Sequence, residues 1–114
     1  MNKHGNEFVE YVAEILEPVG PVTFKSMFGG FGIYKNGRIF AIIIDNELYF
    51  KADTETGAAF AKQGSEQFSY TIKSGKVVKM CYWRVPAEIL DDSGFLQEWF
   101  ALSYQVACKS GSGK

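Results

Sequence analysis

Residues 26–41 read SMFGGFGIYKNGRIFA, a segment with four glycines set among large aromatic side chains. Glycine lets the backbone adopt positive φ or approach another chain closely, while the aromatic rings bury a large apolar area. Asn36-Gly37, between two apolar runs, is a strong hairpin signal, because a type I′ turn requires positive φ at both central positions. The glycine cluster at 29–32 is therefore expected to form a bulge or tight turn that leads into a β-hairpin.

Strands are expected on both sides of this turn, because β-branched and aromatic residues are frequent and helical spacing is absent. The predicted strands cover residues 22–28, 31–34, 38–44 and 47–51, and Asp45-Asn46 supplies a second two-residue turn. Residues 39–44 are apolar without alternation, which predicts a central strand covered on both faces. A second hairpin is predicted from residues 68–73 and 76–83, joined by Ser74-Gly75.

Helices are predicted before, between and after these strands. Apolar residues at positions 8, 11, 12, 15 and 16 have the spacing of an amphipathic helix, with glutamates on its other side. A short helix is expected up to Gly64, a brief one at 87–90, and a last one with a broad apolar face at 95–107. The expected caps are Asp53 or Thr54 for the middle helix and Asp91, Asp92 or Ser93 for the last. The order α-β-β-β-β-α-β-β-α predicts an α+β fold of two layers, with helices packed on an antiparallel sheet.

Length and composition are those of one ordinary globular domain. A chain of 114 residues can bury a core without a disulfide or a metal, and 46% hydrophobic and 22% charged residues are typical values. We expect a single domain over residues 1–108 and a flexible tail over 109–114. A formal net charge of −1 gives no overall attraction to nucleic acid or an anionic membrane, so any basic surface has to be local.

The start of the chain shows no signal-peptide pattern, and no apolar run reaches the length of a membrane span. Cys81 and Cys108 lie far apart and belong to no CxxC pair, which favours reduced structural thiols over a redox or zinc site. A bridge between these two cysteines is the minority alternative. The expected location is the cytoplasm, with no membrane partner.

Three blocks of the sequence stand out together. They are Met27-Phe28-Gly29-Gly30-Phe31-Gly32-Ile33-Tyr34 followed by Gly37 and Phe40-Ala41, then Leu48-Tyr49-Phe50-Lys51-Ala52-Asp53, then Tyr82-Trp83-Arg84-Val85-Pro86. With them the chain resembles the N-terminal domain of the TfoX/Sxy family over residues 8–107. The resemblance implies a fold similar to that of secretion chaperones and a bacterial role in regulating competence, transcription and DNA transformation. Family regulators continue into a helical C-terminal domain, so this chain is interpreted as a stand-alone N-terminal domain, for which another role is also open.

Groups suited to catalysis are scarce in this sequence. The only histidine, His4, is close to the terminus, so no Ser-His or Cys-His pairing on a rigid scaffold is expected. Asp91 and Asp92 precede a helix and are interpreted as caps rather than as an acid/base pair. The ligands of a transition-metal or calcium site are missing, and the glycines at 29–32 precede a strand without phosphate-loop spacing. The chain is therefore predicted not to be an enzyme and to need no cofactor or metal.

The second predicted hairpin carries a local basic surface. Lys73, Lys76, Lys79 and Arg84 occur with no acidic residue between Glu66 and Glu88. Tyr70, Tyr82 and Trp83 are interleaved with them, and basic residues among aromatic ones on a sheet can bind single-stranded nucleic acid. The alternative is that the lysines form a solvated face and the aromatic rings fill the core. A nucleic-acid-binding module over residues 70–84 is accordingly the second hypothesis.

The favoured hypothesis is a regulatory or adaptor domain that acts through protein contacts as a homodimer. A sheet edge or the glycine segment would supply the contact, since aromatic rings beside glycines are candidates for an interface. The candidate contact residues are Met27, Phe28, Gly29, Gly30, Phe31, Gly32 and Tyr34. The alternative for the same residues is that they close one end of the sheet. A small-ligand or enzyme domain would require a deep pocket with convergent polar groups.

Overall fold

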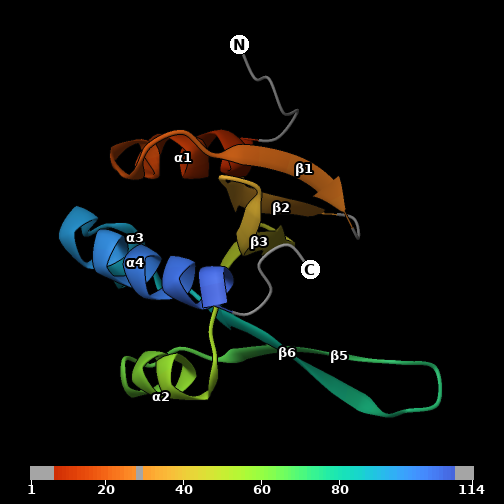
Figure 1. Ribbon diagram of the computed structural model, residues 1–114. Helices are drawn as coiled ribbons and strands as arrows, with labels where there is room; N and C mark the ends of the chain where they lie inside the picture. The colour runs from red at the N-terminus through yellow and green to blue at the C-terminus, as the bar shows by residue number, and fades with distance from the viewer. Residues whose placement is uncertain (1–6, 28–29, 110–114) are drawn as a thin grey trace.

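The computed structural model describes residues 7–27 and 30–109, and in this part of the chain six antiparallel strands form one sheet (Figure 1). The strands are β1 (Thr23–Met27), β2 (Gly30–Lys35), β3 (Arg38–Ile44), β4 (Glu47–Lys51), β5 (Gln67–Thr71) and β6 (Val77–Arg84), in the order β1-β2-β3-β4-β6-β5. The helices are α1 (Glu7–Ile15), the 3-10 helix η1 (Glu17–Val19), α2 (Thr54–Lys62), α3 (Ala87–Leu90) and α4 (Ser93–Lys109). The predicted α+β class and element order are confirmed.

Two tight turns set the register of the first four strands. Asn36 and Gly37 have φ values of 53° and 79°, and Asp45 and Asn46 have values of 51° and 60°. All four lie in the left-handed region that a type I′ turn requires, as the sequence predicted. The predicted end of the first strand at Phe28, and part of the predicted glycine turn, lie outside the described residues.

A β-bulge interrupts the pairing of β2 with β3. Ile33 pairs with Ala41 but Tyr34 pairs with Ile39, so Phe40 is the additional residue. Phe40 and Ala41 both belong to the buried core beneath the helices. The Ser103 hydroxyl of α4 donates a hydrogen bond to the Phe40 carbonyl at 2.7 Å, which anchors α4 over the bulge.

The two faces of the sheet are covered differently. Helices pack on one face, and the ring of Phe40 meets that of Phe100 edge-on at 5.0 Å between centroids. In the described part of the chain no helix covers the other face, which we call the open face (Figure 1). Phe40, Ala41, Ile42 and Ile43 of β3 are nonetheless all buried, as expected for a central strand covered on both faces. Ile42 on the open face is only 3% exposed, because it lies at the bottom of a groove between side chains of neighbouring strands.

Helix α2 begins and ends as its sequence predicts. The Asp53 carboxylate accepts a hydrogen bond from the Thr56 backbone N–H at 2.8 Å, and Gly64 follows the helix with φ 89°. At the last helix, the Asp92 carboxylate accepts from the Phe95 N–H at 3.0 Å, which selects Asp92 among the three predicted caps. Helix α4 runs through Lys109, so that residue belongs to the helix rather than to the predicted tail.

We predict that Asp53→Ala lowers the free energy of unfolding by about 1 kcal/mol at neutral pH, the usual value for a lost N-cap. The hydrogen bond from Thr56 lowers the pKa of Asp53. Stabilisation by the carboxylate is therefore complete above the unfolded-state pKa of about 3.9, and is lost as pH falls through the lower folded-state pKa. Urea denaturation of the wild type and of Asp53→Ala across this pH range should show that the difference between their free energies of unfolding decreases as the pH falls. Asp53→Asn keeps an acceptor and should retain most of the stability at neutral pH, and a loss equal to that of alanine would contradict the capping role.

Candidate functional site

An apolar groove of about 410 Å³ lies on the open face and is the candidate functional site. We call it the open-face groove. It is lined by Met27, Ile42, Ile44, Phe68, Tyr70, Met80 and Tyr82, which come from β1, β3, β5 and β6. Its residues therefore lie on both sides of β4, and only the sheet order brings them together.

The register places a row of side chains across the open face. Lys25 pairs with Gly32, Gly32 with Ile42, Ile42 with Tyr49, and Tyr49 with Arg84. Directly paired residues of antiparallel strands share a face of the sheet. An apolar centre consequently has a lysine at one end of the row and an arginine at the other.

Two glycines of the opening segment permit close packing on this face. A Cβ on Gly32 would lie 2.7 Å from the Met27 sulfur and 3.0 Å from Ile39 Cδ1. A Cβ on Gly30 would collide with the backbone carbonyl of Ile43 on the neighbouring strand. Neither glycine has positive φ. Of the two roles considered for these glycines, close approach is therefore the one that the structure uses.

The candidate contact residues of the glycine segment divide between the two faces. Met27 lines the groove, and Tyr34 lies beneath the Lys25 ammonium at 4.9 Å from the ring centroid. Phe31, in contrast, packs against the core on the helix side. Phe28 and Gly29 lie outside the described residues.

The basic residues of the second hairpin do not form one surface. Lys73 and Lys76 lie in the connection between β5 and β6, whereas Lys79 and Arg84 lie on β6. Side chains alternate along a strand, so Arg84 shares the open face with Tyr82 while Lys79 projects from the other. The eight residues of β6 also separate the two ends of the set by roughly 23 Å at about 3.3 Å per residue.

Two tyrosines of the open face, Tyr82 and Tyr49, have raised pKa values and remain protonated near neutral pH. Burial raises the pKa of Tyr82, which is 6% exposed. Burial is also the main reason that the pKa of Tyr49 is raised; Glu47 adds to the effect, and Arg84 opposes it. The Tyr49 ring meets that of Phe68 edge-on at 4.9 Å between centroids. These phenols act as neutral, largely apolar surfaces in the groove region.

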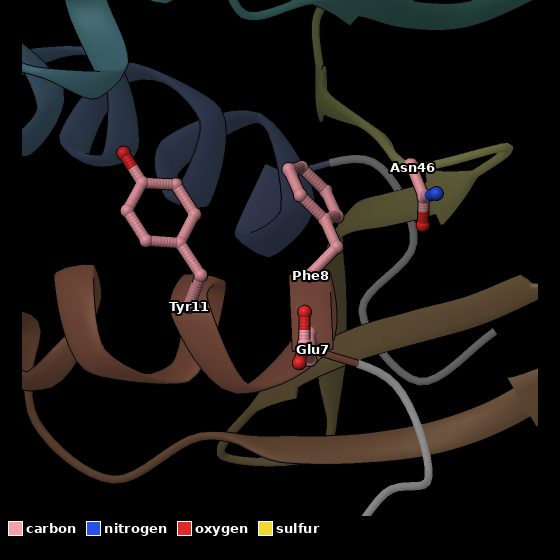
Figure 2. A pocket seen from close by; sticks show the side chains of 4 residues that line it. All are labelled: Glu7, Phe8, Tyr11 and Asn46. Atoms are coloured by element: carbon pink, nitrogen blue, oxygen red, sulfur yellow. The ribbon is translucent and has the colours of Figure 1, made fainter.

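A second hollow, of about 550 Å³, lies between α1 and the β3–β4 turn. Figure 2 shows Phe8 and Tyr11 projecting from α1, with Glu7 on the same helix and Asn46 on the turn. Burial, followed by the charge of Asp91, raises the pKa of Tyr11. These residues bring together no nucleophile with a base, so the hollow offers no recognisable reaction chemistry.

Other features of the described residues concern metals, membranes and thiols. Within residues 7–27 and 30–109, no group of three or more histidine, cysteine or acidic side chains is placed to hold a metal ion. No helix of that part is long and apolar enough to cross a membrane. Cys81 and Cys108 are both free thiols.

Sequence reasoning identified only part of the groove. The sequence analysis names Met27, Tyr70 and Tyr82 on other grounds, but it does not predict that Ile42, Ile44 and Met80 belong to a site. The available signal was the non-alternating run at 39–44, which means that a strand carries apolar residues on both faces. That run does not show which strand lies beside it.

The sequence of this chain is similar to those of known proteins. The sequence profile of the TfoX N-terminal domain matches residues 14–107. The chain belongs to the TfoX N-terminal domain family. It is 30% identical to the DNA transformation protein TfoX1 of Aliivibrio fischeri over 59 residues, which cover 52% of this chain and 28% of that protein. Protein Sxy of Escherichia coli is 29% identical over 72 residues, covering 63% of this chain and 34% of Sxy.

A third relative extends the match over most of the chain. The DNA transformation protein TfoX of Haemophilus influenzae is 27% identical over 100 residues, which cover 86% of this TfoX N-terminal domain and 46% of the relative. The chain thus spans less than half the length of the curated relatives it matches. The suspected family is confirmed.

Proposed function

We propose that this TfoX N-terminal domain is a non-enzymatic regulatory adaptor that acts through protein contacts. The observation that carries the proposal is the open-face groove, an apolar hollow on the sheet face opposite the core. Apolar surface left open on a small domain commonly marks an interaction site. Two relatives are named DNA transformation proteins, which supports a role in DNA transformation, to which this chain would contribute a partner-binding module.

Capture of partners tests this proposal. The immobilised full chain should retain specific proteins from a native bacterial lysate, and Tyr70→Ala should retain them less because Tyr70 lines the groove and is 45% exposed. Phe95→Ala is the matched control, since Phe95 is 50% exposed but lies on α4 in the helix layer. Identical retention by all three proteins would contradict a role for the groove.

A homodimer is part of the same proposal, with a sheet edge as the contact. Strand β5 is an edge strand without a charged residue, whereas β1 at the other edge carries Lys25. Charged edge residues discourage strand pairing between copies, so β5 is the favoured edge. Multi-angle light scattering over a concentration series should give the dimer mass, and a monomer mass throughout would reject this part of the proposal.

The alternative function is nucleic-acid binding through the hairpin at 70–84. Its support is the exposed Tyr70 together with Lys73 and Lys76 at the hairpin end. The opposite projection of Lys79 and Arg84 favours the adaptor proposal instead. Fluorescence anisotropy with single-stranded DNA at low and moderate salt decides between them. Binding unchanged by charge reversal at Lys76 and Lys79 would contradict the alternative.

A further inference from the structure

The outer edge of β5 carries backbone groups with which a further strand can pair. Strand β5 pairs with β6 in regular register over residues 69–71, and the Ile72 N–H donates to the Lys76 carbonyl at 2.9 Å. Backbone groups of successive residues alternate in direction along a strand, so those of Ser69 and Thr71 point away from β6. Within the described part of the chain no further strand lies on that side. The N–H and C=O groups of Ser69 and Thr71 are therefore positioned to extend the sheet.

The side chains of this edge are also suited to pairing. The sequence of β5, QFSYT, lacks the charges and the proline that commonly keep an edge strand from pairing with another chain. By alternation Phe68, Tyr70 and Ile72 lie on the open face, where Tyr70 and Ile72 are 45% and 40% exposed. The edge thus presents a row of exposed apolar side chains beside the outward backbone groups, and an added strand would cover both.

A second copy of β5 matches this edge in one particular register. A two-fold axis perpendicular to the sheet makes the two strands antiparallel and keeps both open faces on the same side. With Tyr70 on the axis, Phe68 of one copy lies opposite Ile72 of the other, and Ser69 lies opposite Thr71. These aromatic, aromatic–β-branched and Ser–Thr pairs are of the kinds that stabilise antiparallel strands. With Ser69 on the axis, Ile72 would instead lie opposite a glutamate.

The charges that flank β5 favour the same antiparallel arrangement. Glu66 precedes the strand and Lys73 follows it. In the register with Tyr70 on the axis, Lys73 of one copy lies opposite Gln67 of the other, one residue from Glu66. Opposite charges therefore come close at both ends of the ladder, whereas parallel strands would bring like charges together. Exposed ion pairs contribute little free energy, so these charges select the direction of pairing more than they strengthen it.

We propose that β5 pairs antiparallel with β5 of a second copy around Tyr70, so that the two open-face grooves join. Each Ser69–Thr71 pair exchanges its N–H···O bonds across the interface. Phe68 and Tyr70 line the groove of each copy, so the second copy supplies the same two side chains at the axis and completes a shared groove. This inference rests on the proposed homodimer. The contact is one strand wide, so the dimer should dissociate on dilution.

Disulfide trapping in the full chain tests the register, after Cys81→Ser and Cys108→Ser have removed the native free thiols. Tyr70→Cys then places two thiols on the axis with Cα atoms about 4.5 Å apart, a separation that a disulfide spans. Ser69→Cys places its Cα atoms about 8 Å apart, which is too far. Thr23→Cys, exposed on the other edge strand β1, is the control. On oxidation, Tyr70→Cys should form covalent dimer roughly tenfold faster or more than either other variant. Equal rates, or a faster rate for Ser69→Cys, would overturn the inference.

Thr71→Pro tests the backbone ladder while Tyr70 stays in place. The Thr71 N–H points outward, so proline removes a hydrogen bond between the copies and none within the sheet. Light scattering over a concentration series should show dimerisation weakened roughly tenfold or more, because each copy loses one donor. Thr71→Val keeps the N–H and should dimerise nearly as the wild type does.

The outcomes separate this inference from the adaptor proposal. If Thr71→Pro loses its thermal transition, the disulfide rates decide alone. A dimer unaffected by proline in a folded variant would overturn pairing through β5. A monomer at every concentration, together with groove-dependent capture of proteins from lysate, would overturn this inference while leaving the adaptor proposal intact.

Discussion

Phe40→Ala is expected to lower the free energy of unfolding by about 3–5 kcal/mol. Phe40 is fully buried, and its ring contacts those of Phe50 at 6.1 Å and Phe100 at 5.0 Å between centroids. It is also the bulge residue whose carbonyl accepts the Ser103 hydrogen bond. Removing the ring leaves a cavity between the sheet and α4 that the bulged backbone cannot close. Because a domain is held by only about 5–15 kcal/mol, the loss is a large fraction of the total.

Urea denaturation followed by circular dichroism measures this loss. The midpoint should fall while the slope with denaturant stays unchanged, since the surface exposed on unfolding is nearly the same. Phe40→Leu keeps most of the apolar volume and should cost clearly less. A Phe40→Ala midpoint close to that of the wild type would show that the packing over the bulge contributes little to stability.

Gly30→Ala is expected to be the second most damaging change, at about 3 kcal/mol. The added Cβ would collide with the Ile43 carbonyl, which is backbone and cannot turn away as a side chain can. Relief requires β2 and β3 to separate where Phe31 pairs with Ile43. The cost therefore comes from strained or broken ladder hydrogen bonds rather than from lost apolar contact.

Gly94→Ala is the matched control for this substitution. Gly94 lies in the first turn of α4, where a Cβ would meet the Asp92 carboxylate at an ordinary 3.4 Å. Alanine favours the helix and restricts the unfolded chain, so stability should stay constant or rise by about 0.4–1 kcal/mol. Thermal denaturation of both variants compares them, and equal effects would contradict the close-approach explanation for Gly30.

Local sequence signals predicted the elements of this fold well. The Asn36-Gly37 and Asp45-Asn46 turns and the Asp53 cap depend on interactions within a few residues, so their sequences specify them. The strand order could not be predicted in the same way. That β6 pairs with β4, leaving β5 at the edge, depends on contacts between residues such as Phe50 and Trp83, far apart in the chain.

The open-face groove could not be predicted from the sequence for a related reason, because it also depends on which strands are neighbours. A non-alternating apolar run such as 39–44 shows that apolar side chains project from both faces of a strand. It does not show whether a second helix covers the far face or whether that face is open to solvent. The bulge at Phe40 also changes which residues face the helices, and no residue type at that position indicates it. Gly30 and Gly32 lie within β2 rather than in the predicted bulge or tight turn, and their close neighbours, Ile43 and Met27, became known only from the pairing.

The β4–β6 junction has a mechanical consequence for the open-face groove. Only three residue pairs join these strands in the ladder, whereas β1 and β2 share five. Met27, Ile42 and Ile44 stand on one side of this junction, and Phe68, Tyr70, Met80 and Tyr82 on the other. Two further backbone hydrogen bonds, from the Ala52 N–H to the Cys81 carbonyl and from the Val85 N–H to the Leu48 carbonyl, extend this ladder at both ends. The two walls of the groove are therefore joined through one continuous sheet, although they come from distant parts of the chain.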